Sequence, residues 1–395
     1  MNRFATYFFF ALAFALLAPV ATTQAQTIVY VDESASGAND GTSWQDAYTN
    51  LQDAFDEANA GSGGYAIHAA EGVYYPDEDM DGDHTGDAPG EAFAFLRDGI
   101  VLRGGYPSGG GMRDPSANPT VLSGDITQND GDPDGDGVIE QGDAQEGENS
   151  FHVISFDGRV ELLTTATGIN GIVVTAGQAD GGFPDNTGGG ALCRGNGSGS
   201  SCGVLIANAV FSGNAGTAGA GLTNLGTDGG QAPSTTINTL FTGNVGAGNG
   251  GAVRNDNADP ALINLTFSDN SANNGGAVFN SSSSPTITNS ILYGDSVSGG
   301  GSEIFNFHPE AQPTVSYSIV QGGESAIASA DDGTVNYEDT NMDVNPQFAA
   351  PGEGITACKG PAQAAGRLRP LTQGTTRPCR IHSRTIWAVW SAFST

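Results

Sequence analysis

The chain has 395 residues, including 60 glycines and 18 prolines, and its 44 acidic residues outnumber its 13 basic ones. About one residue in five is therefore glycine or proline, which excludes long helices. The formal net charge of -31 argues against nucleic acid as a partner, because phosphate binding requires a basic face. Hydrophobic residues make up 38 % of the chain, and with glycine added this share allows a folded core.

The first 25 residues have the pattern of a secretory signal peptide. Arg3 supplies a positive start, residues 7–18 are apolar, and Ala25 is a small residue at a suitable cleavage point. A transmembrane anchor is the alternative, and it fits less well because the apolar run is short and is interrupted by Pro19. We expect residues 1–25 to be removed and the protein to be exported, either secreted or held on the outer surface of a Gram-negative bacterium.

Residues 26–120 contain one helical pattern, and we expect them to form an N-terminal cap and the first coils of the fold. Ser43, with Asp46 three residues later, predicts the start of a helix. The apolar residues that follow recur on one helix face: Ala47, Leu51, Ala54, Phe55 and Ala58. Such a helix would cover strand edges that otherwise recruit other chains.

Residues 121–150 form an acidic loop with the spacing of a calcium site. Counted from Asp132 as position 1, oxygen-bearing residues stand at positions 1, 3 and 5, glycine at 6, an apolar residue at 8 and an acid at 12. The candidate ligands are Asp132, Asp134, Asp136 and Asp143. A solvated acidic loop is the alternative, because position 12 is Asp rather than Glu and flanking helices are missing. A weaker calcium candidate consists of Asp77, Asp79, Asp81 and Asp83.

Two short patterns repeat within residues 151–325. In the first, an aromatic residue precedes asparagine by three positions, and its starts are 30 and 26 residues apart. The second is Gly-Gly-Ala followed by an apolar residue, as at 250–253 and 275–278. The residues of the first pattern are Phe211, Phe241 and Phe267 with Asn214, Asn244 and Asn270, and Tyr293 begins a degenerate copy.

Each repeat predicts one coil of a parallel β-solenoid, because it holds short β-branched runs and no helical period. Coils stack about 4.8 Å apart, so equivalent side chains lie above one another. We expect the three phenylalanines and Tyr293 to form an interior aromatic stack, and the three asparagines to form an amide ladder. A β-propeller is the rival fold, but its blades need about 40 residues.

Cys193 and Cys202 flank a short polar loop inside this region. An exported protein meets oxidising conditions, so a disulfide between them is expected, with two buried free thiols as the alternative. The five histidines show no ligand spacing, which gives no reason to expect a transition-metal site.

The last 45 residues differ from the rest of the chain. Residues 351–395 hold six of the thirteen basic residues, among them Lys359, the one lysine of the sequence, and the glycine pattern stops there. We interpret this basic tail as a frameshifted end, with a binding arm as the alternative. Residues 27–350 then carry a net charge of about -37. Such self-repulsion is screened at high salt, which suggests a halophilic source.

The repeats within residues 151–325 resemble the polymorphic outer-membrane protein repeat of bacterial surface adhesins and autotransporters. That resemblance implies the right-handed parallel β-helix of the pectin-lyase-like superfamily. The segment from Asn149 to Val153 resembles the entry to the solenoid in such proteins. Residues 326–350, which include Asn345-Pro-Gln-Phe348, resemble the start of a C-terminal choice-of-anchor module, although its usual closing segment is absent.

The basic residues decide between two functions. Polysaccharide lyases need a basic side chain as proton acceptor and glycoside hydrolases need paired carboxylates. Residues 27–350 contain six basic residues, which are Arg97, Arg103, Arg113, Arg159, Arg194 and Arg254. We therefore expect a non-catalytic adhesin-like or structural protein, steadied by calcium, monomeric, and binding an extracellular protein or glycan. A secreted carbohydrate-active β-helix enzyme is the alternative.

Overall fold

The computed structural model describes residues 26–76 and 88–348. The predicted signal peptide, the weaker calcium candidate at residues 77–83 and the basic tail lie outside these residues. Within them, no helix is both long and apolar enough to cross a membrane.

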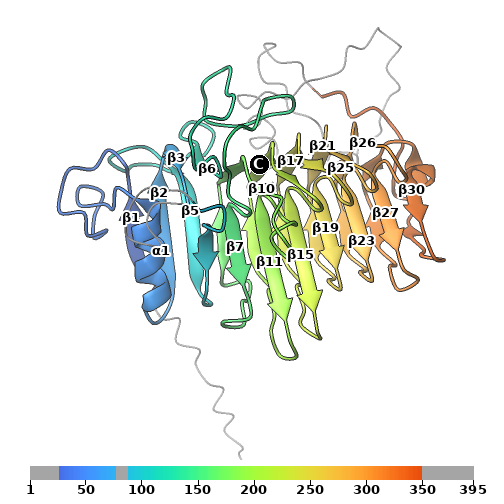
Figure 1. Ribbon diagram of the computed structural model, residues 1–395, viewed down its shortest axis with the longest axis horizontal. Helices are drawn as coiled ribbons and strands as arrows, with labels where there is room; N and C mark the ends of the chain where they lie inside the picture. The colour runs from blue at the N-terminus through green and yellow to red at the C-terminus, as the bar shows by residue number, and fades with distance from the viewer. Residues whose placement is uncertain (1–25, 77–87, 349–395) are drawn as a thin grey trace, which may run out of the picture.

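The described chain winds into a right-handed parallel β-helix, which confirms the predicted fold and excludes a propeller (Figure 1). The strands form four parallel sheets, called A to D. Along a complete coil the chain contributes one strand to sheet A, then one to sheet B, a short one to sheet D and one to sheet C. Each strand pairs in parallel with the equivalent strand of the next coil, as β11 does with β7 and β15.

Sheet A has ten strands, which are β1 (Thr27–Val31), β2 (Tyr65–Ala70), β5 (Ile100–Tyr106), β8 (Gly168–Asn170), β12 (Leu205–Ala207), β16 (Thr235–Ile237), β20 (Ala261–Ile263), β24 (Thr286–Thr288), β28 (Thr314–Ser316) and β31 (Asn336–Tyr337). Sheet B has eight strands, which are β3 (Gly72–Tyr74), β6 (Thr120–Ser123), β9 (Val173–Thr175), β13 (Val210–Ser212), β17 (Leu240–Thr242), β21 (Thr266–Ser268), β25 (Ile291–Leu292) and β29 (Ile319–Val320).

Sheet C also has eight strands, which are β4 (Phe93–Phe95), β7 (Ile154–Asp157), β11 (Ala191–Asn196), β15 (Leu222–Thr227), β19 (Val253–Asp256), β23 (Val278–Ser281), β27 (Ile304–Phe307) and β30 (Ile327–Ser329). The short sheet D consists of β10 (Gln178–Ala179), β14 (Ala215–Gly216), β18 (Val245–Gly246), β22 (Ser271–Ala272) and β26 (Ser296–Val297). A 3-10 turn, η1 (Gly323–Ala326), precedes β30.

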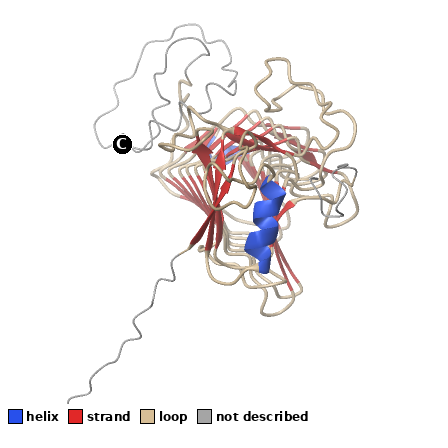
Figure 2. Cartoon of the chain, turned by 90° about the vertical axis from the view of Figure 1, so that its left-hand side faces the viewer, coloured by secondary structure: helices blue, strands red, loops and turns tan. Residues whose placement is uncertain are grey.

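One α-helix, α1 (Leu51–Ala60), lies across the N-terminal end of the coils (Figure 2). Its Leu51 and Phe55 are buried, as the apolar pattern predicts. The predicted start was wrong, because the Ser43 hydroxyl donates to the Asp46 carboxylate and the helix begins eight residues after Ser43. Asn50 is the true N-cap, and its side chain accepts from the backbone N–H of Gln52.

The core of the repeats contains the stack of Phe211, Phe241 and Phe267. Neighbouring ring centroids are 4.9 and 5.3 Å apart, and the planes differ by 12° and 10°. Tyr293 does not join this stack, in contrast to our expectation. Leu292 pairs with Phe267 in the next coil, so the register places Tyr293 one position farther on, and its ring meets Phe348 edge-on instead.

Buried asparagines form the ladder that the repeats predict. The Nδ2 of Asn214 donates to Oδ1 of Asn244 at 2.9 Å, and that of Asn244 donates to Oδ1 of Asn270 at 2.8 Å. Each link also satisfies main-chain groups, since Nδ2 of Asn244 donates to the carbonyl of Phe211. A second interior ladder in sheet C was not predicted, and its members are Asn224, Asn255, Asn280 and Asn306.

Candidate functional site

Three carboxylates of the acidic loop lie close together. Asp132, Asp134 and Asp136 each offer an oxygen within 4.8 Å of the others. The loop reverses tightly, because both oxygens of Asp132 accept backbone N–H groups, from Gly135 and Gly137, at 2.8 Å. Burial, and then the neighbouring Asp134, raises the pKa of Asp136 to about 6. Three converging hard oxygens fit a calcium ion.

Asp143 does not belong to this group of three. Its Oδ2 accepts the backbone N–H of Glu140 at 2.9 Å, which closes the end of the loop. The structure thus brings together three of the four residues that the spacing selects. The weaker candidate at Asp77, Asp79, Asp81 and Asp83 lies outside the described residues.

Residues 138–145, here called the strap, follow the carboxylates and lie on the outer face of sheet B. Val138 packs against Val173 and Val210. The Ser212 hydroxyl donates to the carbonyl of Ile139 at 2.8 Å. Farther along, the side chains of Gln141 and Gln145 donate to the carbonyls of Asp269 and Gly213. The strap therefore ties several successive coils together along the solenoid.

The outer face of sheet C carries a cluster of opposite charges. Arg159 holds Asp157 through two bonds, Nε to Oδ1 at 2.7 Å and Nη2 to Oδ2 at 2.5 Å. The pairing register places Arg194 beside Asp157. Burial, and then the charge of Arg159, lowers the pKa of Arg194, and its Nε has no hydrogen-bond partner in the described chain.

His152 and Asp185 border this cluster. The Nε2 of His152 lies 3.6 Å from Oδ1 of Asp185, and its Nδ1 is 3.0 Å from the carbonyl of Gly188. The contact with His152 lowers the pKa of Asp185. A carboxylate, two arginines and an Asp–His pair therefore meet on one face. Arg254 lies farther along sheet C, paired with Asp256 at 2.8 Å.

The described structure joins Cys193 and Cys202 in a disulfide, and both are buried. The bond closes the loop that follows β11, and both cysteines belong to the hydrophobic core of the solenoid. The disulfide that we predicted from export and spacing is therefore present in the structure.

Sequence reasoning did not single out the outer face of sheet A in the first coils. There the neighbouring strands β1, β2, β5 and β8 each place one polar or aromatic residue in the same row. The row consists of Tyr30, His68, Arg103 and Asn170. Their separations along the chain are irregular, so no period predicts this row. A signal was nevertheless present, because Arg103 and Arg113 are two of only six basic residues between residues 27 and 350.

No family model matches the sequence, and no curated protein matches it. Among solved structures, pectin methylesterase PemA from Erwinia chrysanthemi has a TM-score of 0.40 and 14 % identity, over 78 % of this chain and 82 % of that chain. A pectin methylesterase in complex with a hexasaccharide has a TM-score of 0.39 and 13 % identity, over the same shares. The pectin methylesterase from Aspergillus niger has a TM-score of 0.33 and 12 % identity, over 82 % of this chain and 92 % of that chain.

Proposed function

We propose that the chain is an exported β-helix protein that binds an extracellular protein or glycan as a monomer, in the manner of a surface adhesin or structural module. Calcium steadies its acidic loop in this proposal. The observation that carries it is the strap on sheet B, which begins beside three converging carboxylates and forms hydrogen bonds to more than one coil. The buried disulfide supports export, because such bonds persist in oxidising compartments.

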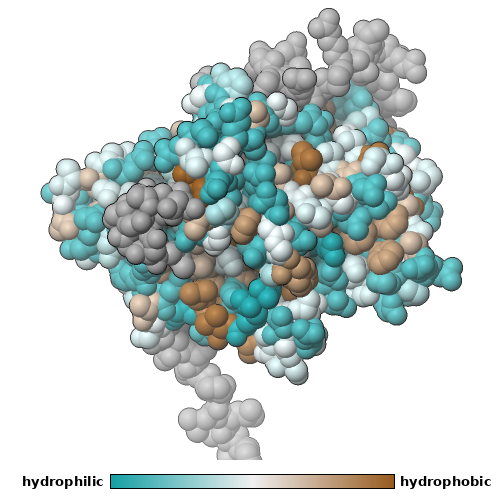
Figure 3. Space-filling view, in the orientation of Figure 1, coloured by the Kyte–Doolittle hydropathy of each residue, from teal (hydrophilic) through white to brown (hydrophobic). Residues whose placement is uncertain are grey.

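The visible outer surface supports a binding role over a membrane-embedded one. Apolar side chains gather there in small separated patches among hydrophilic ones (Figure 3). A protein of this shape offers ligands long sheet faces and loops. Calcium would neutralise the mutual repulsion of Asp132, Asp134 and Asp136, and so would hold the beginning of the strap against sheet B.

Calcium binding is tested by calorimetry on protein freed of divalent ions. We expect heat of binding in the wild type and a higher melting temperature, since calcium at 100 times its Kd stabilises by about 2.7 kcal/mol. Asp134→Asn should weaken both effects, whereas the exposed Asp339→Asn removes the same charge elsewhere and should not. A wild type that shows neither heat nor stabilisation refutes the calcium role.

Export is tested by expressing the full chain in a Gram-negative host and separating the cell fractions. We expect the processed protein in the outer-membrane fraction or in the medium. Unprocessed protein confined to the cytoplasm would contradict the proposal.

The charged cluster on sheet C favours a second candidate function, a secreted carbohydrate-active enzyme. Asp157, Arg194 and the Asp185–His152 pair place acid, base and cation on one face, as proton-transfer catalysis requires. The paired state of Asp157 weighs against it, because Arg159 occupies both carboxylate oxygens. A zymogram panel of neutral and acidic glycans tests this candidate. Activity that Asp157→Asn abolishes would support an enzyme, and a wild type without activity on any glycan would refute it.

A further inference from the structure

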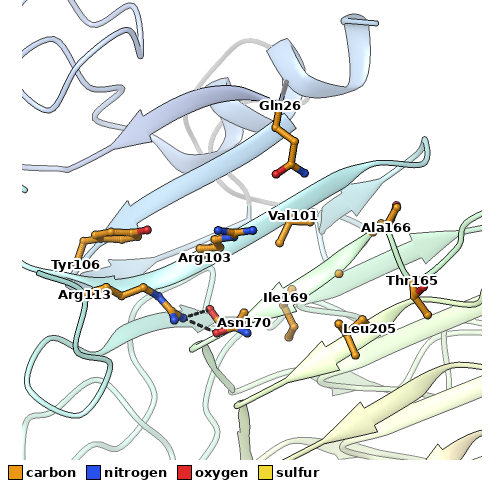
Figure 4. Close-up of a pocket in the computed structure, with 12 residues that line it drawn as sticks. Gln26, Val101, Arg103, Tyr106, Arg113, Thr165, Ala166, Ile169, Asn170 and Leu205 are labelled. Atoms are coloured by element: carbon orange, nitrogen blue, oxygen red, sulfur yellow. Dashed lines mark hydrogen bonds between the residues drawn. The ribbon is translucent and has the colours of Figure 1, made fainter. Parts of the chain in front are cut away.

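A pocket of about 550 Å³ opens on the outer face of sheet A in the first coils. Arg103, Tyr106, Arg113 and Asn170 line it together with Gln26 (Figure 4). Small-molecule sites usually enclose about 300–1,000 Å³, so this pocket has room for one compact ligand. It lies on a different sheet from the charged cluster and from the acidic loop.

Four rings form a continuous group beside the pocket. The rings of His68 and Tyr106 stack with centroids 4.7 Å apart and planes 20° apart. Trp44 lies 5.2 Å from Tyr106 and 4.9 Å from Tyr30. Burial, and then Arg103 and Arg113, lowers the pKa of His68 to about 4, so that its ring is uncharged at neutral pH. The ring of Tyr106 lines the pocket, and the half-buried rings of Trp44 and His68 pack against it and hold it in place.

The two arginines of the pocket have no carboxylate partner among the described residues. Arg113 is fixed by carbonyl oxygens, since Nε donates to Gly104 at 2.6 Å and Nη2 donates to both oxygens of Asn170. Its Nη1 makes no hydrogen bond within the described chain. Arg103 is exposed and forms no ion pair or hydrogen bond there, and none of the residues that line the pocket is acidic.

This local charge is opposite to that of the surrounding protein. Residues 27–350 carry about -37, so a long polyanion meets repulsion over most of the surface. Screening acts over about 8 Å at physiological salt, so a small anion inside the pocket feels mainly the two arginines. Guanidinium groups bind carboxylates through paired N–H groups, and aromatic walls bind flat rings.

We propose that the pocket binds a small organic acid that contains a ring, with its carboxylate on Arg103 and Nη1 of Arg113 and its ring against Tyr106. The inference rests on the proposed binding role and gives that role a ligand class. A free aromatic acid and an acidic monosaccharide share this chemistry, and the test distinguishes them.

The test uses calorimetry and ligand-detected NMR on the full chain with benzoate and with glucuronate. Each acid is compared with its neutral methyl ester. We expect an acid to bind at least about tenfold more tightly than its ester, and Arg103→Gln to reduce that affinity by a similar factor. Arg254→Gln removes the same charge on sheet C and should leave the affinity unchanged. The stronger of the two acids identifies the source of the ligand.

Three outcomes would overturn the inference. They are equal affinity of acid and ester, an unchanged affinity in folded Arg103→Gln, and no binding of either acid at millimolar concentration. The calcium and export experiments use other parts of the chain. Success there together with failure here therefore refutes the pocket's ligand and not the proposed function.

Discussion

The carboxyl groups of Asp295 and Glu303 lie close enough inside the solenoid to interact electrostatically. Asp295 occupies the fourth place of the ladder and accepts from Nδ2 of Asn270 at 2.7 Å. Glu303 is fully buried, and neither of its carboxyl oxygens has a hydrogen-bond partner among the described residues. Burial, and then the charge of Asp295, raises the pKa of Glu303, so that Glu303 stays protonated at neutral pH.

Glu303→Gln should stabilise the protein at pH 8 and have little effect at pH 4. Below the ordinary pKa of 4.5 the residue is protonated in both the folded and the unfolded chain, and its contribution is fully present. As pH rises above that value, the unfolded chain loses the proton while the folded chain keeps it. The wild type then loses about 1.4 kcal/mol per pH unit, which the amide avoids.

Urea unfolding at several pH values measures this difference between wild type and variant. Glu310→Gln is the matched control, because Glu310 is exposed. A difference for Glu303→Gln that stays constant from pH 4 to pH 8 would show that the residue ionises normally in the folded state.

Asn244→Ala should destabilise the protein by about 2–4 kcal/mol. Asn244 is fully buried, and its loss removes the acceptor of the Asn214 backbone N–H and the amide bonds to Asn214 and to the carbonyl of Phe211. Asn273 follows β22 in the next coil and is exposed, so Asn273→Ala should cost less than about 0.5 kcal/mol. Equal unfolding free energies of the two variants would contradict a stabilising role of the ladder.

Replacing Cys193 and Cys202 by serine should lower the unfolding free energy by about 2.5–3 kcal/mol. The two cysteines are nine positions apart, and closing a loop of this length restricts the unfolded chain by that amount. Denaturation with and without reductant provides the measurement. Reductant should weaken the wild type and leave the double variant unchanged, and any other pattern contradicts this account.

Salt should raise the melting temperature of the protein, consistent with the proposed halophilic source. The screening length falls from about 10 Å at 0.1 M to about 3 Å at 1 M, which weakens repulsion among the carboxylates. A series in KCl at pH 7 measures the effect, and at pH 4 the response should shrink because many carboxylates are protonated. A melting temperature that does not change with KCl at pH 7 would contradict the proposed halophilic source.

The interior of the repeats could be predicted from local patterns. The pattern to which Phe241 and Asn244 belong recurs at nearly constant intervals. In a parallel stack, a constant interval places equivalent side chains above one another. Tyr293 shows the limit of this reasoning. Its coil pairs Leu292 with Phe267, and a shift of one residue in a strand turns a side chain to the other face.

Local patterns along the chain were enough to predict a parallel β-helix, the position of its repeats and the spacing of an acidic loop, because each depends on neighbouring residues or on a regular period. The separation of Asp143 from Asp132 and the proximity of Glu303 to Asp295 depend instead on how the folded chain packs. The same is true of Arg103, which lies beside His68 and Asn170. The first coils differ in length, so strand pairing, and no sequence interval, brings those side chains together.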